Sequence, residues 1–588
     1  MKRKLVLRLL DDHSIVKYCP YLFASLCLFS APAKAPAQTT IKTLSPPNVI
    51  VVNLDDVGPA WFPPYARNIQ PGDVEQKICE EYAQLHKKEG VFDLDKHLEA
   101  ARHSMPFLDH LARSGMIFDR CFSSSSLCAP SRSGLLTGRY QQRWGAYFLD
   151  DVAQVTGIPD AVPVLATNFQ QAGYLCGAIG KWHVSLRDES LLPDMQAAKR
   201  KLKAEHPKLT PKQLDLAADK ATGYRSSFAK GESPLDRGFD YYLGYNLDHS
   251  HYYKAYDLWE NGHRVPERPA GEFLTDFFNQ KCLEFVTRAL SEHKHFLLYY
   301  APMSLHGSLM PPPKKYSSQF HTGIQFTDDW AGHLLAVDEG LQNIYEELKA
   351  HGQDQNTLLI LTADNGQTWY RVPPYNAPYR GGKGSGWLGG SHVPLIISWP
   401  AGLKGLTRHE SHALVSQLDA FPTALAAAGL APGKPVDGRS LLPLLEGKTE
   451  ASPNENIFSA GVQSVNWSDS YFTPGALEVK EPNNYAESGK CPYYAWVQNP
   501  ETLLMYVTPT KPGVYAEFPT GRPAQELFFN LPADPRQTNN IFGDTPAVQT
   551  AAGELRGWLQ QTQPPPLKHL DDYQELLQLS GASPAPVP

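Results

Sequence analysis

The chain has 588 residues and a formal net charge of −7 at pH 7. That length is more than one hydrophobic core usually serves, so two domains are expected. Apolar residues make up 42% of the chain and charged residues 20%, which excludes a wholly disordered or collagen-like chain. The acidic balance argues against a general nucleic-acid-binding protein, which needs a basic face. An anionic ligand must therefore be held by a local group of cations.

The N-terminus predicts an export signal. Four basic residues fall within the first eight positions, a short apolar run follows at 21–30, and small residues suited to cleavage stand at 31–33 and 35–37. The apolar run is too short to span a bilayer, and no later stretch resembles a membrane span. We therefore expect a signal peptide at 1–37, a periplasmic or secreted protein, and no integral membrane segment. The alternative is a start codon assigned too early, ahead of a shorter leader.

Beyond the leader, short apolar strands alternate with helical patterns. This order is typical of an α/β fold whose mostly parallel sheet is covered on both faces by helices. In chain order, we predict a strand at 48–54, helices at 105–114 and 164–172, a strand at 174–179, a helix at 273–290, a strand at 296–301, a helix at 328–350, and strands at 357–362 and 394–399.

The composition changes after Leu445, where short strands, Pro, Asn and aromatic residues become frequent. We predict an α/β domain at 38–451 and a smaller α+β domain at 452–588, whose last residues form a frayed tail. Two segments look inserted into the first domain, at 59–103 and 188–233.

Oxygen-bearing side chains follow two strands that are far apart in the sequence. Asp55 and Asp56 come directly after the first predicted strand, and Asp364 and Asn365 follow the fourth. Functional groups of a parallel sheet gather beyond the carboxyl ends of its strands, so these four side chains are expected to meet. Such ligands suit calcium or magnesium rather than zinc. Taken alone, an Asp-Asp pair or an Asp-Asn-Gly run is more often a turn or a helix cap.

A short motif, Cys128-Ala129-Pro130-Ser131-Arg132, carries the most specific signal in the chain. Pro130 suits the first turn of a helix, where its missing N–H costs nothing. Cys128 then lies at the positive N-terminal end, where an anion is favoured, and Arg132 lies one turn along the same face. The alternative is an ordinary helix start with a buried thiol.

This motif, followed by Leu136-Thr137-Gly138-Arg139, resembles the formylglycine signature of type I sulfatases, the arylsulfatase-like branch of the alkaline phosphatase superfamily. The resemblance implies that Cys128 is oxidised to an aldehyde by a formylglycine-generating maturation enzyme, and that Arg132 stabilises it. The hydrated aldehyde offers one hydroxyl to attack sulfur and a second that helps to expel sulfate as the carbonyl re-forms.

The same resemblance implies a fold and a metal site. It predicts the alkaline-phosphatase-like α/β fold, with a small C-terminal subdomain that contains an antiparallel sheet. The family motifs D-D-x-G and D-N-G bind calcium beside the formylglycine. The implied ligands of one calcium ion are Asp55, Asp56, Asp364, Asn365 and the side chain made from Cys128.

Two further segments resemble sulfate-binding motifs of the family. In Gly173–His183, the resemblance assigns Lys181 to sulfate oxygens and His183 to the formylglycine hydroxyl as a base, although Cys176 stands where Ser or Thr is usual. In the glycine-rich run that starts at Arg380, the resemblance assigns Lys383 to sulfate. Nearby, Leu388 replaces the usual Glu and His392 the usual Arg, so the local support is expected to differ. The segment 527–541 resembles a stretch that closes many sulfatases, with Gln537 where Glu is usual.

A general acid is needed for the departing alcohol. The family carries a histidine for this role after the strand predicted here at 296–301, and His306 lies there without the usual flanking prolines. His249 and His251 are rival candidates. They belong to the aromatic segment 239–262, which either shapes a sugar pocket or packs into the core.

The expected function is hydrolysis of a sulfate ester on a sulfated carbohydrate or an aryl sulfate. One alternative keeps the formylglycine but acts on phosphonate monoesters or phosphodiesters, and another is a non-catalytic relative that binds sulfated glycans.

The insert at 188–233 is rich in Lys and helix formers, so it either meets a sulfated polymer or forms a solvated helical face. The natural substrate and the position of its sulfate stay open.

Overall fold

The computed structural model describes residues 45–149, 152–265, 271–368, 370–404, 406–462, 493–507 and 526–562. The predicted signal peptide lies outside these residues, as does the predicted tail. Among the residues described, no helix combines the length and the apolar character that a membrane span requires.

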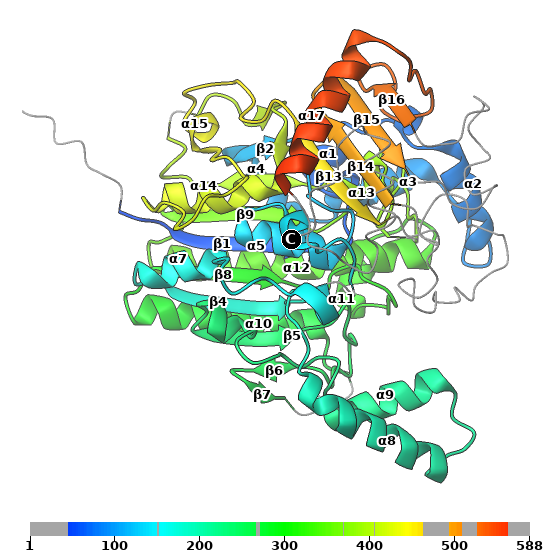
Figure 1. Cartoon of the computed structure of the whole chain (residues 1–588), viewed down its shortest axis with the longest axis vertical. Helices are drawn as coiled ribbons and strands as arrows, with labels where there is room; N and C mark the ends of the chain where they lie inside the picture. The colour runs from blue at the N-terminus through cyan, green and yellow to red at the C-terminus, as the bar shows by residue number, and fades with distance from the viewer. Residues whose placement is uncertain are drawn as a thin grey trace, which may run out of the picture. The chain divides into compact units, whose positions relative to one another are not determined.

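A ten-stranded sheet forms the centre of the fold, in the order β11-β2-β10-β9-β1-β8-β4-β5-β6-β7. Its middle strands β9, β1, β8, β4 and β5 are parallel, and Figure 1 shows them stacked one above another. The register pairs Val51 of β1 with Tyr299 on one side and Ile360 on the other. Strand β10 runs antiparallel to both of its neighbours, and β6 and β7 extend the far edge as an antiparallel pair. The bounds are β1 Asn48–Leu54, β2 Met116–Phe118, β4 Leu175–Lys181, β5 Tyr241–Tyr245, β6 Trp259–Glu260, β7 His263–Arg264, β8 Phe296–Ala301, β9 Thr357–Ala363, β10 Leu395–Ser398 and β11 Glu410–Ser411.

Helices cover both faces of this sheet. One layer joins α4 (Pro106–Ser114), α12 (Gln325–Ala350) and α10 (Leu274–Ser291), and the other contains α7 (Leu165–Gln171), α14 (Ala420–Ala427) and α5 (Cys128–Thr137). Every residue of β1, β8 and β9 is buried, which explains why these strands have continuous apolar sequences rather than alternating ones. The mostly parallel sheet between helices confirms the predicted fold class.

A separate four-stranded antiparallel sheet follows the large one, in the order β13-β14-β15-β16. Helix α17 (Pro546–Thr562) packs against β14 and β15, and its Trp558 stacks on Phe458 with ring centroids 5.3 Å apart. The small antiparallel sheet was expected, whereas the boundary between 451 and 452 stays a prediction. The strands are β13 Ile457–Val462, β14 Tyr493–Gln498, β15 Thr502–Val507 and β16 Glu526–Asn530.

The two predicted inserts are helical. The first holds η1 (Pro59–Trp61), α1 (Pro63–Ala66), η2 (Pro71–Asp73), α2 (Gln76–Leu85) and α3 (Leu94–His103). The second holds η5 (Glu189–Leu191), α8 (Leu192–Glu205) and α9 (Pro211–Thr222), and α8 and α9 pack on each other as a hairpin that projects from the body (Figure 1). The remaining elements are β3 Cys121–Phe122, η3 Gln141–Trp144, η4 Val152–Thr156, η6 Pro234–Arg237, α11 Lys314–Ser317, α13 Leu388–Ser391, β12 Val415–Ser416, η7 Gln417–Asp419 and α15 Leu442–Leu445.

Candidate active site

All ten residues that the sequence assigned to chemistry lie buried around one edge of the sheet, where β1, β4 and β9 end and α5 begins. None is more than 6% exposed, so their charges and polar atoms need partners among themselves or on a ligand. Their roles stay predictions. The set is Asp55, Asp56, Cys128, Arg132, Lys181, His183, His306, Asp364, Asn365 and Lys383.

Two of these residues have strained backbones. Asp56 has φ 60° and His183 has φ 58°, which is the left-handed region that residues with a side chain seldom adopt. Each such residue costs on the order of 1–3 kcal/mol and persists only where its surroundings hold it. Each stands two residues beyond the last residue of a strand, β1 or β4, so the chain turns sharply there and aims the side chain into the site.

The oxygen ligands predicted from two distant strands do meet. The backbone N–H of Asp56 donates to Asp364 Oδ1 at 3.1 Å, and Asn365 Nδ2 donates to Asp56 Oδ1 at 2.8 Å. The other amide atom, Asn365 Oδ1, is buried and has no hydrogen-bond partner among the described residues. Burial, and then the neighbouring Asp55, raises the pKa of Asp364. A cation placed among these oxygens would relieve that repulsion and satisfy the orphaned amide oxygen, so the residues fit a hard metal ion.

Three cations lie against the carboxylates. Arg132 Nη2 is 2.8 Å from Asp364 Oδ2 and 3.3 Å from Asp55 Oδ1, and Lys181 Nζ is 2.9 Å from Asp55 Oδ2. Lys383 Nζ lies 2.7 Å from Asp56 Oδ1. Burial opposes the charge on Lys383, but Asp56 and the Cys128 side chain hold its pKa above the usual value. Three cations therefore balance three carboxylates, and a divalent metal ion would make the site positive.

Cys128 is the first residue of α5, and its Sγ lies 3.6 Å from His183 Nδ1. Burial, and then Lys181, lowers the pKa of His183 well below its usual value, so this imidazole is neutral and can accept a proton. One turn along α5, Arg132 Nη1 donates to the backbone oxygen of Lys181 at 3.2 Å. The helix ends at Gly138, whose φ of 64° suits a residue without a side chain.

His306 has one nitrogen fixed and one facing the carboxylates. Its Nδ1 donates to Gly307 O at 2.9 Å, and its Nε2 lies 3.8 Å from Asp56 Oδ2. A ring nitrogen of His306 and carboxylate oxygens of Asp55 and Asp56 all lie within 4.8 Å of one another, so His306 could also bind a metal ion. Burial and Lys383 lower its pKa.

The two rival histidines have different surroundings. The His249 ring stacks almost parallel on His306, with centroids 5.6 Å apart, and its Nδ1 lies 3.0 Å from Asp248 Oδ2. His251 Nδ1 instead accepts the backbone N–H groups of Tyr253 and Lys254, each at 3.0 Å, which gives it a structural role in a turn.

The residues that depart from the family pattern have structural contacts. His392 Nε2 donates to Asp119 O at 2.9 Å, and burial lowers the pKa of His392 to about 4. Its ring meets Tyr379 edge-on at 4.7 Å. The backbone N–H of Leu388 donates to Gln537 Oε1 at 3.3 Å, so Gln537 supports the loop that carries Lys383.

Sequence reasoning missed Gln417, which connects two parts of the site. Its Nε2 donates to Ala363 O at the end of β9, at 2.7 Å, and its Oε1 accepts from Ser131 in α5 at 2.8 Å. Gln417 thereby holds the start of α5 against the strand that carries Asp364. It lies in no recognisable motif, and only the tertiary contact identifies it.

The aromatic residues of 239–262 mostly pack inward. Tyr242, Tyr245 and Tyr252 are each at most 2% exposed, and the Tyr252 hydroxyl donates to the backbone oxygens of Ser304 and His306. These contacts favour the core-packing alternative and give Tyr252 a role in shaping the loop that holds His306.

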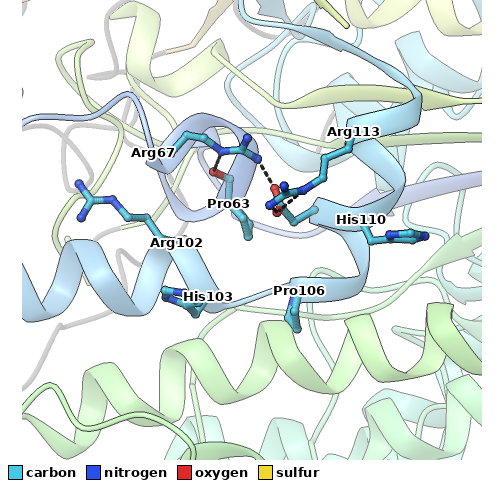
Figure 2. Close-up of a pocket in the computed structure, with 8 residues that line it drawn as sticks. Pro63, Arg67, Arg102, His103, Pro106, His110 and Arg113 are labelled. Carbon is cyan, nitrogen blue, oxygen red and sulfur yellow. Dashed lines mark hydrogen bonds and ion pairs between the residues drawn. The ribbon is translucent and has the colours of Figure 1, made fainter.

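A cavity of about 490 Å³ lies between α1, α3 and α4 and shares no residue with this site. Arg67 and Arg113 converge there on the single carboxylate of Asp109 (Figure 2). The charges of Arg67 and Arg113 are therefore partly neutralised by Asp109. The candidate catalytic residues lie outside this cavity. The cavity is lined by Pro63, Arg67, Arg102, His103, Pro106, Asp109, His110 and Arg113.

Comparison with known proteins identifies the family. The family model described as Sulfatase matches residues 95–430, more than half of the chain, and the chain belongs to the sulfatase family. It is a sulfuric ester hydrolase, and the family generally uses formylglycine and a metal ion.

Relatives cover most of the chain. The uncharacterized sulfatase YdeN of Escherichia coli is 29% identical over 534 residues, which cover 90% of this chain and 88% of YdeN. Human N-acetylgalactosamine-6-sulfatase is 29% identical over 392 residues, 62% of this chain and 65% of the human protein. The crystal structure of Ps i-CgsB in complex with k-i-k-neocarrahexaose is 20% identical, with a TM-score of 0.61 over 91% of this chain and 98% of that chain. This similarity confirms the alkaline-phosphatase-like fold.

Proposed function

We propose that the protein hydrolyses sulfate esters of carbohydrates, using a formylglycine made from Cys128 beside one calcium ion. The observation that carries the proposal is the meeting of Asp55, Asp56, Asp364 and Asn365 around the start of α5. All four offer hard oxygen atoms, which calcium prefers. The ion would polarise the attacking hydroxyl and offset charge on a sulfate oxygen.

The nucleophile and its base come from α5 and the end of β4. A hydrated aldehyde at position 128 supplies one hydroxyl for attack on sulfur and another for the release of sulfate. His183 is neutral and 3.6 Å from the Cys128 side chain, which suits it to accept a proton there. Arg132 holds Asp364 and the backbone of Lys181 in place from the next turn of the helix.

The sulfate group is held by lysines. Lys181 and Lys383 each lie within 3.0 Å of a different carboxylate, that of Asp55 and that of Asp56. With a divalent ion among those carboxylates, the two ammonium groups are left to face the anionic substrate. Preorganised charges of this kind stabilise the charge that develops in the transition state.

His306 is the proposed proton donor to the departing alcohol. The hydrogen bond from Nδ1 to Gly307 O fixes the ring, so Nε2 faces the site and donates a proton there when the imidazole is protonated. Tyr252 is buried, and its hydroxyl donates to the backbone oxygen of His306 at 3.0 Å. This arrangement keeps Nε2 at one position, 3.8 Å from Asp56 Oδ2.

A carbohydrate substrate is supported by the similarity to human N-acetylgalactosamine-6-sulfatase and by the chemistry of the family. Aryl sulfates are expected to serve as activated substrates. The proposal also includes export of the protein, from the leader at 1–37, activation by a maturation enzyme, and a division into a catalytic domain at 38–451 and a C-terminal subdomain at 452–588.

The direct test compares two sulfate esters with one phosphodiester, using matured protein. Release of sulfate from N-acetylgalactosamine 6-sulfate and from 4-nitrophenyl sulfate is expected to exceed turnover of bis(4-nitrophenyl) phosphate at equal concentration. Faster turnover of the phosphodiester would support the alternative of a formylglycine-dependent phosphodiesterase. An unmodified thiol at Cys128 in protein from its native host would support a non-catalytic relative.

Replacing His306 with alanine should affect substrates unequally. A sugar alcohol is a poor leaving group that needs a proton, so kcat/KM for a sulfated sugar is expected to fall by roughly 10²–10⁴-fold. For 4-nitrophenyl sulfate, whose leaving group needs no proton, the loss should be below about tenfold. His251→Ala is the matched control, because the Nδ1 of His251 accepts two backbone N–H groups of a turn. Equal losses on both substrates in His306→Ala would assign His306 to metal binding or structure.

A further inference from the structure

Helices α8 and α9 form a projecting arm, residues 192–222, which we name the basic arm. Figure 1 shows it extending away from the sheet beyond β6 and β7. A helix of 14 residues such as α8 is roughly 21 Å long. The arm thus places side chains well outside the body of the protein.

The arm carries a local excess of positive charge in an acidic chain. Between Lys199 and Lys208 there are five basic residues and one acidic residue, Glu205, so this stretch has a charge of +4 while the whole chain has −7. Arg200, Lys203 and Lys208 are exposed, and none of them has an ion-pair partner among the described residues. Free cations of this kind attract a flexible polyanion.

The arm adds little to the core. Met195 is the one buried residue of α8, and it packs toward α9, where Leu214 and Ala218 are buried. Thr210 caps α9 through a reciprocal bond with Gln213. Each helix is thus stabilised mainly by the other, and the exposed cations serve no packing role.

The base of the arm joins the segment beside the active site. The backbone oxygen of Lys220 accepts from Arg264 at 2.9 Å, and the Lys220 ammonium lies over the Tyr256 ring at 5.0 Å. Just after the arm, Ser227 O accepts from Asn246 Nδ2 at 3.0 Å. Asn246 stands three residues before His249, whose ring stacks on His306. A continuous set of contacts therefore connects the arm with the side of the site where the alcohol departs.

We propose that the basic arm binds a sulfated polysaccharide chain whose scissile ester lies in the active site. The claim that the bound chain is also the substrate rests on the proposed function, while the binding itself does not. A membrane surface is disfavoured because 192–222 contains no Trp, Phe or Tyr, the residues that anchor interfacial helices.

The experiment reverses three exposed charges in the matured full chain: Arg200→Glu, Lys203→Glu and Lys208→Glu together. Binding of dextran sulfate at low salt is expected to weaken at least about tenfold, because exposed charges act over about a Debye length. The KM for a sulfated polysaccharide should rise by at least about fivefold for the same reason. Turnover of 4-nitrophenyl sulfate, which cannot reach the arm, should stay within about twofold of the unchanged protein, since no arm residue belongs to the site.

The matched control reverses Lys294, Lys349 and Lys404 to Glu. These residues are exposed and lie outside the arm: Lys294 precedes β8, Lys349 lies in the last turn of α12, and Lys404 follows β10. The control should bind dextran sulfate as the unchanged protein does. Equal binding by the arm variant and the control would overturn the inference, as would tighter, arm-dependent binding to vesicles of anionic lipid. If the arm variant loses dextran sulfate binding but the unchanged protein releases no sulfate from any ester, the arm proposal holds and the proposed function fails.

Discussion

Replacing Cys128 with alanine is expected to abolish hydrolysis of every sulfate ester that the protein accepts. The variant loses the group that attacks sulfur, and removing a nucleophile costs on the order of 10⁴-fold or more in kcat. The fold should persist, because Cys128 begins α5 at a position where alanine is tolerated and Pro130 still lies in the first turn. Sulfate release and the melting temperature, measured on the same preparation, check both halves of the prediction.

A serine at position 128 gives a sharper result. Its hydroxyl can attack sulfur, but it has no second hydroxyl to expel sulfate, so a sulfated protein should accumulate after one turnover. Mass spectrometry of the intact protein after incubation with 4-nitrophenyl sulfate would detect it. Cys282→Ala is the matched control, since Cys282 is buried in α10 away from the site and should leave activity unchanged. Full activity in Cys128→Ala would refute the role of Cys128.

Replacing Asp364 with alanine is expected to remove both metal binding and activity. Asp364 accepts from the backbone of Asp56 and pairs with the fully buried Arg132, so its loss leaves a buried cation with a weaker partner, Asp55 at 3.3 Å. Breaking a buried pair in this way costs about 3–5 kcal/mol of stability. Calcium affinity should fall at least ~100-fold, because Asp364 is a proposed ligand and also accepts the hydrogen bond that positions Asp56, another proposed ligand.

Two variants separate metal binding from stability. Asp364→Asn keeps an acceptor for the Asp56 N–H and should lose less stability than Asp364→Ala, while it still loses calcium. Asp338→Asn removes a different buried carboxyl, one that accepts from the backbone of α4 and whose pKa burial raises to about 7. It should leave calcium binding and kcat unchanged. Calorimetric titration with calcium is the measurement, and unchanged affinity in Asp364→Ala would contradict the ligand assignment.

The fold could be predicted from local patterns wherever an element is long and buried. The strand 48–54 matches β1 because it is a continuous apolar run, and the helix 105–114 matches α4 to within one residue because its apolar residues recur at helical spacing. The helix at 328–350 begins three residues earlier, at Gln325, in the structure. The short strands β2, β6, β7 and β11, at or next to the edges of the sheet, were not predicted, since two or three residues carry no period and depend on their neighbours.

The residues of the site could be predicted from sequence motifs, but the residues that hold them in place could not. Asp55 and Asp364 could be placed together because parallel strands end at the same edge of a sheet, and the structure brings them together. Gln417 was missed because a single polar side chain that connects a helix to a strand has no sequence signature. The aromatic segment 239–262 left two alternatives open, and only the burial of Tyr242 and Tyr252 distinguishes them.

A crystal structure of the matured protein, grown with calcium, tests the account most directly. The account predicts a formylglycine at position 128 and an ion within about 2.3–2.6 Å of oxygens from Asp55, Asp56, Asp364 and Asn365. An intact thiol in active protein, or an ion bound away from the ends of β1 and β9, would contradict it.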